Sequence, residues 1–190
     1  GLEIAREIPD MPVYYYHIPV LTGVDIDMIS FLRAADGMIP NLAGVKFTHE
    51  NFDDFQACRQ YAGGKYDMLW GRDETWLTAL ETGAKGAVGS TFNYAAPIYQ
   101  QITEAFHNRD MDRARKLQDK AVDMINLLGK YGGIATGKSY MKYLGLDCGE
   151  FRLPLKNMTD AAFLNFKEDV ALIGFETFCS KKPQAIKTGS

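Results

Sequence analysis

The sequence contains few of the residues that mark disulfide-rich and metal-binding proteins. Its cysteines are Cys58, Cys148 and Cys179. They are odd in number and show no Cys-x-x-Cys spacing, which favours free thiols in a reducing compartment and predicts a cytoplasmic protein. The three histidines, His17, His49 and His107, lie far apart along the chain. This spacing predicts no metal site.

An excess of one charge and a long apolar run are also absent. The chain has 21 basic and 24 acidic residues, a net charge of −3, and no basic cluster of the kind that nucleic-acid-binding proteins carry. No apolar stretch reaches the roughly 18 residues needed to span a bilayer. The 190 residues, 46% of them hydrophobic, are enough for one substantial core. We therefore expect a globular protein with neither nucleic-acid nor membrane partners.

What the sequence does contain is an alternation of strand and helix patterns. Strands are predicted at residues 13–18, 44–48, 66–70 and 86–89, and helical patterns follow at 25–35, 51–62, 73–82 and 94–107. Further helices are predicted at 110–128, 138–145 and 159–175. This alternation is typical of parallel strands joined by right-handed crossovers. It fits either a doubly wound open sheet or part of a (β/α)8 barrel, since a whole barrel takes about 250 residues.

One predicted strand carries a lysine at an unusual position. Lys46 shares a strand face with Gly44 and Thr48, because successive side chains point to opposite faces. If both faces of the sheet are covered, a lysine here is either ion-paired or kept for its amine. Burial favours the neutral amine, which forms a Schiff base with a carbonyl carbon. The simpler alternative is an edge strand whose lysine faces water.

Polar side chains gather where each predicted strand passes into its loop, the edge at which parallel α/β proteins build their sites. The candidates are Tyr16, Lys46, Thr48, Gly71, Asp73, Glu74 and Ser90. Several have simpler interpretations: Tyr16 as a core tyrosine, Asp73 and Glu74 as a favourable helix start, and Ser90 as a helix cap. Their convergence on one edge favours a functional site.

A second motif suggests a phosphate-binding protein. Residues 132–139, Gly-Gly-Ile-Ala-Thr-Gly-Lys-Ser, match the GxxxxGK[ST] pattern of phosphate-binding loops. That chemistry requires a buried strand directly before the loop, whereas the residues before it have the spacing of an amphipathic helix. We interpret this segment as a glycine-rich connection between two helices.

Several motifs together resemble the N-acetylneuraminate lyase and dihydrodipicolinate synthase family of class I aldolases. They are Tyr15-Tyr16-His17-Ile18-Pro19, Thr22-Gly23, Gly44-Val45-Lys46 and Gly86-Ala87-Val88-Gly89-Ser90-Thr91. The resemblance spans about residues 13–145 and implies a (β/α)8 TIM barrel with additional C-terminal helices, usually in a homotetramer. The matching strands are the last four of eight, and the Gly-x-x-Gly-Glu loop of the family is absent. We therefore expect residues 1–109 to form the C-terminal half of the barrel and residues 110–190 a helical region packed on it. The N-terminal half-barrel is expected either to be supplied by another polypeptide segment or to be missing from this sequence.

The resemblance also implies roles for the candidate residues. Lys46 corresponds to the lysine that forms an imine with pyruvate, without a cofactor or a metal, and Tyr16 to the tyrosine that shuttles the proton. The positions that hold the sugar portion of the substrate correspond to Thr48, Gly71, Asp73, Glu74 and Ser90.

Within the family, the sialic acid branch fits best. Leu21 lies where the synthase branch has an arginine, and the Gly-x-Asp-Glu arrangement of residues 71–74 resembles the lyases. The expected reaction is cleavage of N-acetylneuraminate to N-acetylmannosamine and pyruvate. The alternatives are another pyruvate-dependent member, such as a 2-keto-3-deoxy sugar acid aldolase or a dihydrodipicolinate synthase-like enzyme, and a non-catalytic half-barrel.

Overall fold

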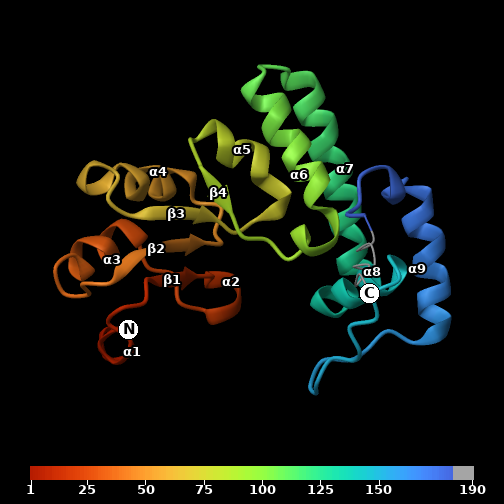
Figure 1. The fold of residues 1–190 in the computed structure, drawn as a ribbon, viewed down its shortest axis with the longest axis horizontal. Coiled ribbons are helices and arrows are strands. Elements are labelled where there is room, and N and C mark those ends of the chain that lie inside the picture. Colours follow the sequence, from red (N-terminus) through yellow and green to blue (C-terminus); the bar gives the residue numbers. More distant parts are fainter. Residues whose placement is uncertain (182–190) are drawn as a thin grey trace, which may run out of the picture. The chain divides into compact units, whose positions relative to one another are not determined.

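The computed structural model describes residues 1–181 (Figure 1). The chain divides into two compact units, Gly1–Gly89 and Ser90–Ser190. This division follows the contacts within the chain, whereas the expected boundary between residues 109 and 110 marks the end of the barrel. That boundary stays a prediction.

The first unit is a parallel sheet with helices between its strands. The strands are β1 (Val13–His17), β2 (Leu42–Phe47), β3 (Asp67–Trp70) and β4 (Gly86–Ala87), in the order β1-β2-β3-β4. The helices are α1 (Leu2–Glu7), α2 (Pro19–Thr22), α3 (Met28–Ala35), α4 (Phe52–Gln60) and α5 (Trp76–Glu81), with 3-10 turns η1 (Tyr61–Gly63) and η2 (Asp73–Thr75). The predicted alternation of parallel strands and helices is confirmed.

One face of this sheet is an aromatic core against the helices. His17, Phe47 and Trp70 occupy one row across β1, β2 and β3, and all are buried. Phe55 of α4 places its ring 5.5 Å from Phe47 and 5.1 Å from Trp70, both edge to face. Such aromatic pairs stabilise the packing beyond their buried area. This face therefore holds the strands in their register.

The opposite face is only partly covered. Tyr16 is 48% exposed, Tyr14 and Val88 are also exposed, and Lys46 is partly buried. The condition that both faces of the sheet are covered is therefore not met in the described chain. Within residues 1–181, β1 and β4 each pair with a strand on one side only, as the outer strands of an unclosed barrel segment do.

The start of α3 differs from the helical pattern predicted from residue 25. The helix begins at Met28, and no side chain at its N-cap position forms a capping bond. Instead, Asp54 of α4 accepts hydrogen bonds from the Met28 amide at 2.8 Å and the Ile29 amide at 3.0 Å. The buried carboxylate thus ties the two helices together and satisfies two amides that α3 leaves unpaired.

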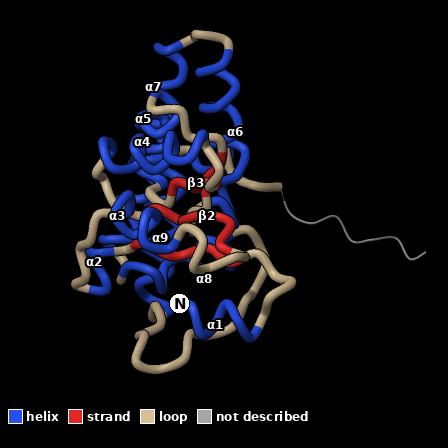
Figure 2. Tube along the Cα trace, turned by 90° about the vertical axis from the view of Figure 1, so that its left-hand side faces the viewer, coloured by secondary structure: helices blue, strands red, loops and turns tan. Residues whose placement is uncertain are grey.

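The second unit is helical. It contains α6 (Phe92–His107), α7 (Met111–Lys130), η3 (Gly133–Ala135), α8 (Thr136–Tyr143), α9 (Asp160–Leu172) and η4 (Phe175–Thr177). Helices α6 and α7 run side by side as a hairpin in both views (Figures 1 and 2). Its core is aromatic, with Tyr94, Tyr140, Phe166 and Phe175 all buried. Among residues 1–181, no helix has the length and apolar character required to cross a bilayer.

The glycine-rich segment at residues 132–139 follows α7 and contains η3 and the first residues of α8. The element before it is a 20-residue helix and not a strand, and Lys138 Nζ donates to the Glu150 carbonyl at 2.8 Å. The prediction of a helix-to-helix connection is confirmed, and the arrangement that a phosphate-binding loop requires is absent here.

The cap at α3 predicts a site-specific loss of stability. Asp54→Ala leaves the Met28 and Ile29 amides without their acceptor, so the free energy of unfolding in urea should fall by about 1–3 kcal/mol. Asp53→Ala is the matched control, because this exposed neighbour also lies in the first turn of α4 and should change the value by less than about 0.5 kcal/mol. Equal losses in the two variants would contradict the assignment.

Candidate active site

The centre of the candidate site is a pair of side chains on adjacent strands. Tyr16 of β1 and Lys46 of β2 lie opposite each other in the parallel register, and Lys46 Nζ is 4.2 Å from the centre of the Tyr16 ring. Within residues 1–181, Lys46 belongs to no ion pair. Its amine is therefore positioned by a phenol ring and not neutralised by a carboxylate, which leaves it available for chemistry.

Beyond this pair, the strand ladder continues to Thr48 and Gly71. The Thr48 amide donates to the His17 carbonyl and the Gly71 amide to the Phe47 carbonyl, each at 2.8 Å. A Cβ atom on Gly71 would lie 1.9 Å from Thr48 Oγ1, so the Thr48 side chain occupies space that only glycine leaves free. Thr48 Oγ1 is buried and has no hydrogen-bond partner in the described chain. Such an orphaned hydroxyl is uncommon in native structures and is explained if it binds a ligand.

Asp73 lies on the loop that follows β3. It is only 7% exposed, which is unlike a carboxylate that merely begins a helix at the surface. A Cβ atom on Gly89 would lie 1.7 Å from Asp73 Oδ1. The carboxylate therefore contacts the backbone that follows β4, and the chain segments after these two strands meet at the same edge of the sheet.

Glu74 belongs to an ionic cluster with Arg72 and Glu50. The sequence did not predict this cluster. Arg72 Nη2 is 3.2 Å from Glu50 Oε1, and Arg72 Nε is 3.7 Å from Glu74 Oε2. The second distance is too long for a hydrogen bond, so Glu74 is paired only weakly. Arg72 and Glu50 also line an open surface cavity of about 590 Å³. Arg72 lies between the candidate residues Gly71 and Asp73 in the sequence. This position is the one sequence signal that could have identified Arg72 as part of the site.

Ser90 is the one candidate outside the first unit. It is exposed and opens the second unit. The proposed cap at Ser90 is wrong, because α6 begins at Phe92 with Thr91 at the N-cap position. The Ser90 carbonyl instead accepts a hydrogen bond from Asn93 Nδ2 at 3.0 Å.

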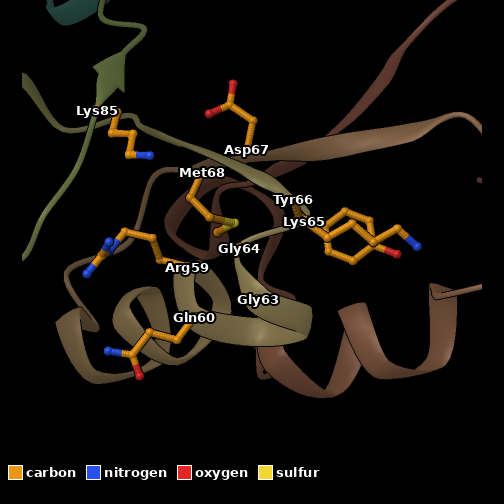
Figure 3. A pocket seen from close by; sticks show the side chains of 9 residues that line it. All are labelled: Arg59, Gln60, Gly63, Gly64, Lys65, Tyr66, Asp67, Met68 and Lys85. Atoms are coloured by element: carbon orange, nitrogen blue, oxygen red, sulfur yellow. The ribbon is translucent and has the colours of Figure 1, made fainter.

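Another cavity, of about 530 Å³, opens near the amino ends of β3 and β4 (Figure 3). Its lining is basic but does not converge, because Lys65 and Tyr66 extend to one side and Arg59 and Gln60 to the other. Lys65 Nζ is also held by Asp36 Oδ1 at 2.5 Å. Since active sites of (β/α)8 barrels are built at the carboxyl ends of the strands, the Lys46 end is the better candidate.

Comparison with known proteins identifies one family by sequence. The family model described as the dihydrodipicolinate synthetase family matches residues 2–172. N-acetylneuraminate lyase of Rattus norvegicus is 37% identical over 179 residues, which cover 93% of this chain and 56% of the relative. The chain spans about half the length of the curated relatives it matches.

Solved structures of related enzymes are also similar to this chain. Proteus mirabilis N-acetylneuraminate lyase superposes with a TM-score of 0.86 at 40% identity, over 90% of this chain and 58% of that one. A catalytic lysine mutant of Ruminococcus gnavus sialic acid aldolase gives a TM-score of 0.79 at 28% identity, over 92% and 58%. These relatives are (β/α)8 barrels, so the barrel prediction is confirmed and the doubly wound alternative is excluded.

The contact between Thr48 and Gly71 predicts a strong substitution effect. Gly71→Ala forces a methyl group against Thr48 Oγ1, so the free energy of unfolding should fall by about 1–3 kcal/mol. The double variant Gly71→Ala/Thr48→Ala removes the closest atom and should recover part of that loss. Gly129→Ala is the control, since nothing lies within 4 Å of a Cβ there and alanine within α7 should stabilise by about 0.5–1 kcal/mol. Urea unfolding of the variants measures these changes, and a Gly71→Ala protein as stable as the wild type would contradict the contact.

Proposed function

Because the chain belongs to the dihydrodipicolinate synthetase family, we propose that it is part of a class I aldolase that cleaves N-acetylneuraminate to N-acetylmannosamine and pyruvate. The observation that carries this proposal is the Lys46 amine 4.2 Å from the Tyr16 ring, on neighbouring strands of a parallel sheet. The reaction needs no cofactor, because the covalent imine between Lys46 and the substrate supplies the electron sink.

The proposed steps begin at the keto carbon, C2, of the open-chain sugar acid. The neutral Lys46 amine adds to C2, and loss of water gives a protonated imine. As the C3–C4 bond breaks, the Tyr16 oxygen accepts the proton of the C4 hydroxyl while its own hydroxyl proton passes to water, so the aldehyde forms at C4 and the bonding electrons move to the imine nitrogen. The resulting enamine takes a proton from water at C3, and hydrolysis of the imine releases pyruvate and restores the amine.

Further protein must cover the open face of the sheet for this chemistry. In the described chain Tyr16 is half exposed, whereas a neutral amine is favoured by removal of water. We propose that further strands of the barrel pair with β1 and β4 and enclose Lys46, in a homotetramer located in the cytoplasm.

The sugar portion of the substrate would be held by polar groups next to this pair. Thr48 contributes a buried hydroxyl without a partner in the described chain, and Asp73 and Glu74 contribute carboxylates that accept hydrogen bonds from sugar hydroxyls. Gly71 provides space beside Thr48. The role of Ser90 in substrate binding, which the family resemblance implies, stays a prediction. The lyase reaction is preferred over other reactions of the family because the similar curated and solved proteins include N-acetylneuraminate lyases. A panel of 2-keto-3-deoxy sugar acids and of pyruvate with aldehydes tests the alternatives.

The imine can be trapped chemically. Borohydride added to the full-length protein with pyruvate should reduce the imine and attach pyruvate irreversibly to Lys46, as peptide mass spectrometry would detect. Lys46→Ala should lose the label, while Lys85→Ala, which changes an exposed lysine, should keep it. Equal labelling of Lys46→Ala and the wild type would exclude the proposed nucleophile, and no labelling of the wild type would favour the non-catalytic alternative.

A substitution of Tyr16 distinguishes imine formation from bond cleavage, because the Tyr16 hydroxyl is proposed to act only in cleavage. Tyr16→Phe removes the proton-carrying hydroxyl, so kcat for N-acetylneuraminate cleavage should fall roughly 100-fold or more, while borohydride trapping of pyruvate persists. Tyr14→Phe is the matched control, because Tyr14 lies on the same face of β1 but donates its hydroxyl to Asp67 Oδ2 at 3.0 Å. Steady-state kinetics should show the control within about threefold of the wild type. Similar losses in both variants would count against a specific role for Tyr16.

A further inference from the structure

The fold brings together two of the histidines that lie far apart in the sequence. His17 Nε2 is 3.4 Å from His49 Nδ1, and His49 Nδ1 is 3.8 Å from Asp25 Oδ1. One ligand atom from each of the three residues lies within 4.8 Å of the others. His17 ends β1, His49 follows β2, and Asp25 lies in the segment before α3. Two imidazoles and a carboxylate are the ligand types that zinc takes in proteins.

We propose that His17, His49 and Asp25 form a zinc site at the carboxyl ends of β1 and β2, with water as the fourth ligand. This inference goes beyond the proposed aldolase function and does not rest on it. It also revises the prediction of no metal site, which relied on the separation of the histidines along the chain.

The distance between the two imidazoles favours a tetrahedral ion. With metal–nitrogen bonds of about 2.0–2.1 Å, ligand atoms on a tetrahedron are roughly 3.3–3.4 Å apart, whereas neighbouring ligands of an octahedral ion with similar bonds are only about 3.0 Å apart. The observed separation of 3.4 Å matches the tetrahedral value. It is also at the long end of the range for a hydrogen bond between two ring nitrogens.

The surroundings allow an ion to enter and to be held. His17 is 1% exposed, whereas the side chains of His49 and Asp25 are 33% and 71% exposed, so a buried anchor is combined with two outer ligands. Asp25 needs to approach His49 by about 0.5 Å to reach tetrahedral spacing. It lies within residues 24–27, which have no regular secondary structure, and this segment can make that movement.

One aromatic ring lies close to both imidazoles. The ring of Phe47, 5.1 Å from that of His17 and 6.3 Å from that of His49, contributes an apolar wall.

The ion would act as a structural link. It would join the end of β1, the segment before α3 and the chain after β2. His17 follows Tyr16 and His49 follows Thr48 in the sequence, so the link would hold the two strand ends that carry the proposed catalytic pair. The site faces away from Lys46, because consecutive residues of a strand point to opposite faces.

The test measures metal binding directly on the full-length protein after treatment with a chelator. Isothermal titration with Zn²⁺ should give one site per chain, and Co²⁺ should show the intense visible absorption of a tetrahedral complex. His49→Ala should weaken zinc binding by more than roughly 100-fold, since loss of even a second-shell partner lowers affinity about 10–100-fold. Asp25→Asn should weaken it by about 10-fold or more. Both changes are at partly or fully exposed side chains, so the variants are expected to fold.

The control is His107→Ala, which removes the remaining histidine, at the end of α6, and should bind zinc as the wild type does. Absence of zinc binding by the wild type, unchanged binding by His49→Ala, or an octahedral Co²⁺ spectrum would each overturn the proposal. Pyruvate trapping on the zinc-free protein tests the aldolase function separately, so failure of either proposal can be recognised on its own.

Discussion

The parallel register of β1 and β2 is the constraint on which the candidate site depends. His17, Phe47 and Trp70 are buried against the helices, and because side chains alternate along a strand, Tyr16, Lys46 and Leu69 must then point to the other face. A slip of one residue would move every one of these side chains to the wrong face. Core packing on the helix side therefore determines the position of the proposed nucleophile on the opposite side.

Close approaches between backbone and side chains build the rest of the site. Gly71 leaves room for the Thr48 side chain, and Gly89 leaves room for the Asp73 carboxylate, since a Cβ atom at either glycine would overlap these groups. Both contacts join segments that follow neighbouring strands of the sheet. The polar groups proposed to bind the sugar can therefore occupy these positions only because Gly71 and Gly89 have no side chain. Glycine is commonly found where chain segments approach closely.

The two proposals use opposite faces of the same strand ends. Tyr16 and Thr48 face the side that carries Lys46, while His17 and His49 follow them in the sequence and lie toward the helices. On one side, the proposed chemistry requires an amine removed from water by further strands of the barrel. On the other, the proposed zinc site would be complete within the described chain. An ion there would reduce the movement of the strand ends without contacting the substrate.

Sequence by itself determined the alternation of strands and helices and the face on which Lys46 lies. These features depend on periodicity, which the sequence displays directly. Only the tertiary structure decided that Asp54 caps α3 from 26 residues away, that His17 meets His49 across 32 residues, and that one face of the sheet is left partly open. The physical reason is that such contacts arise from strand pairing and helix packing, which bring distant residues together without leaving a local pattern in the chain.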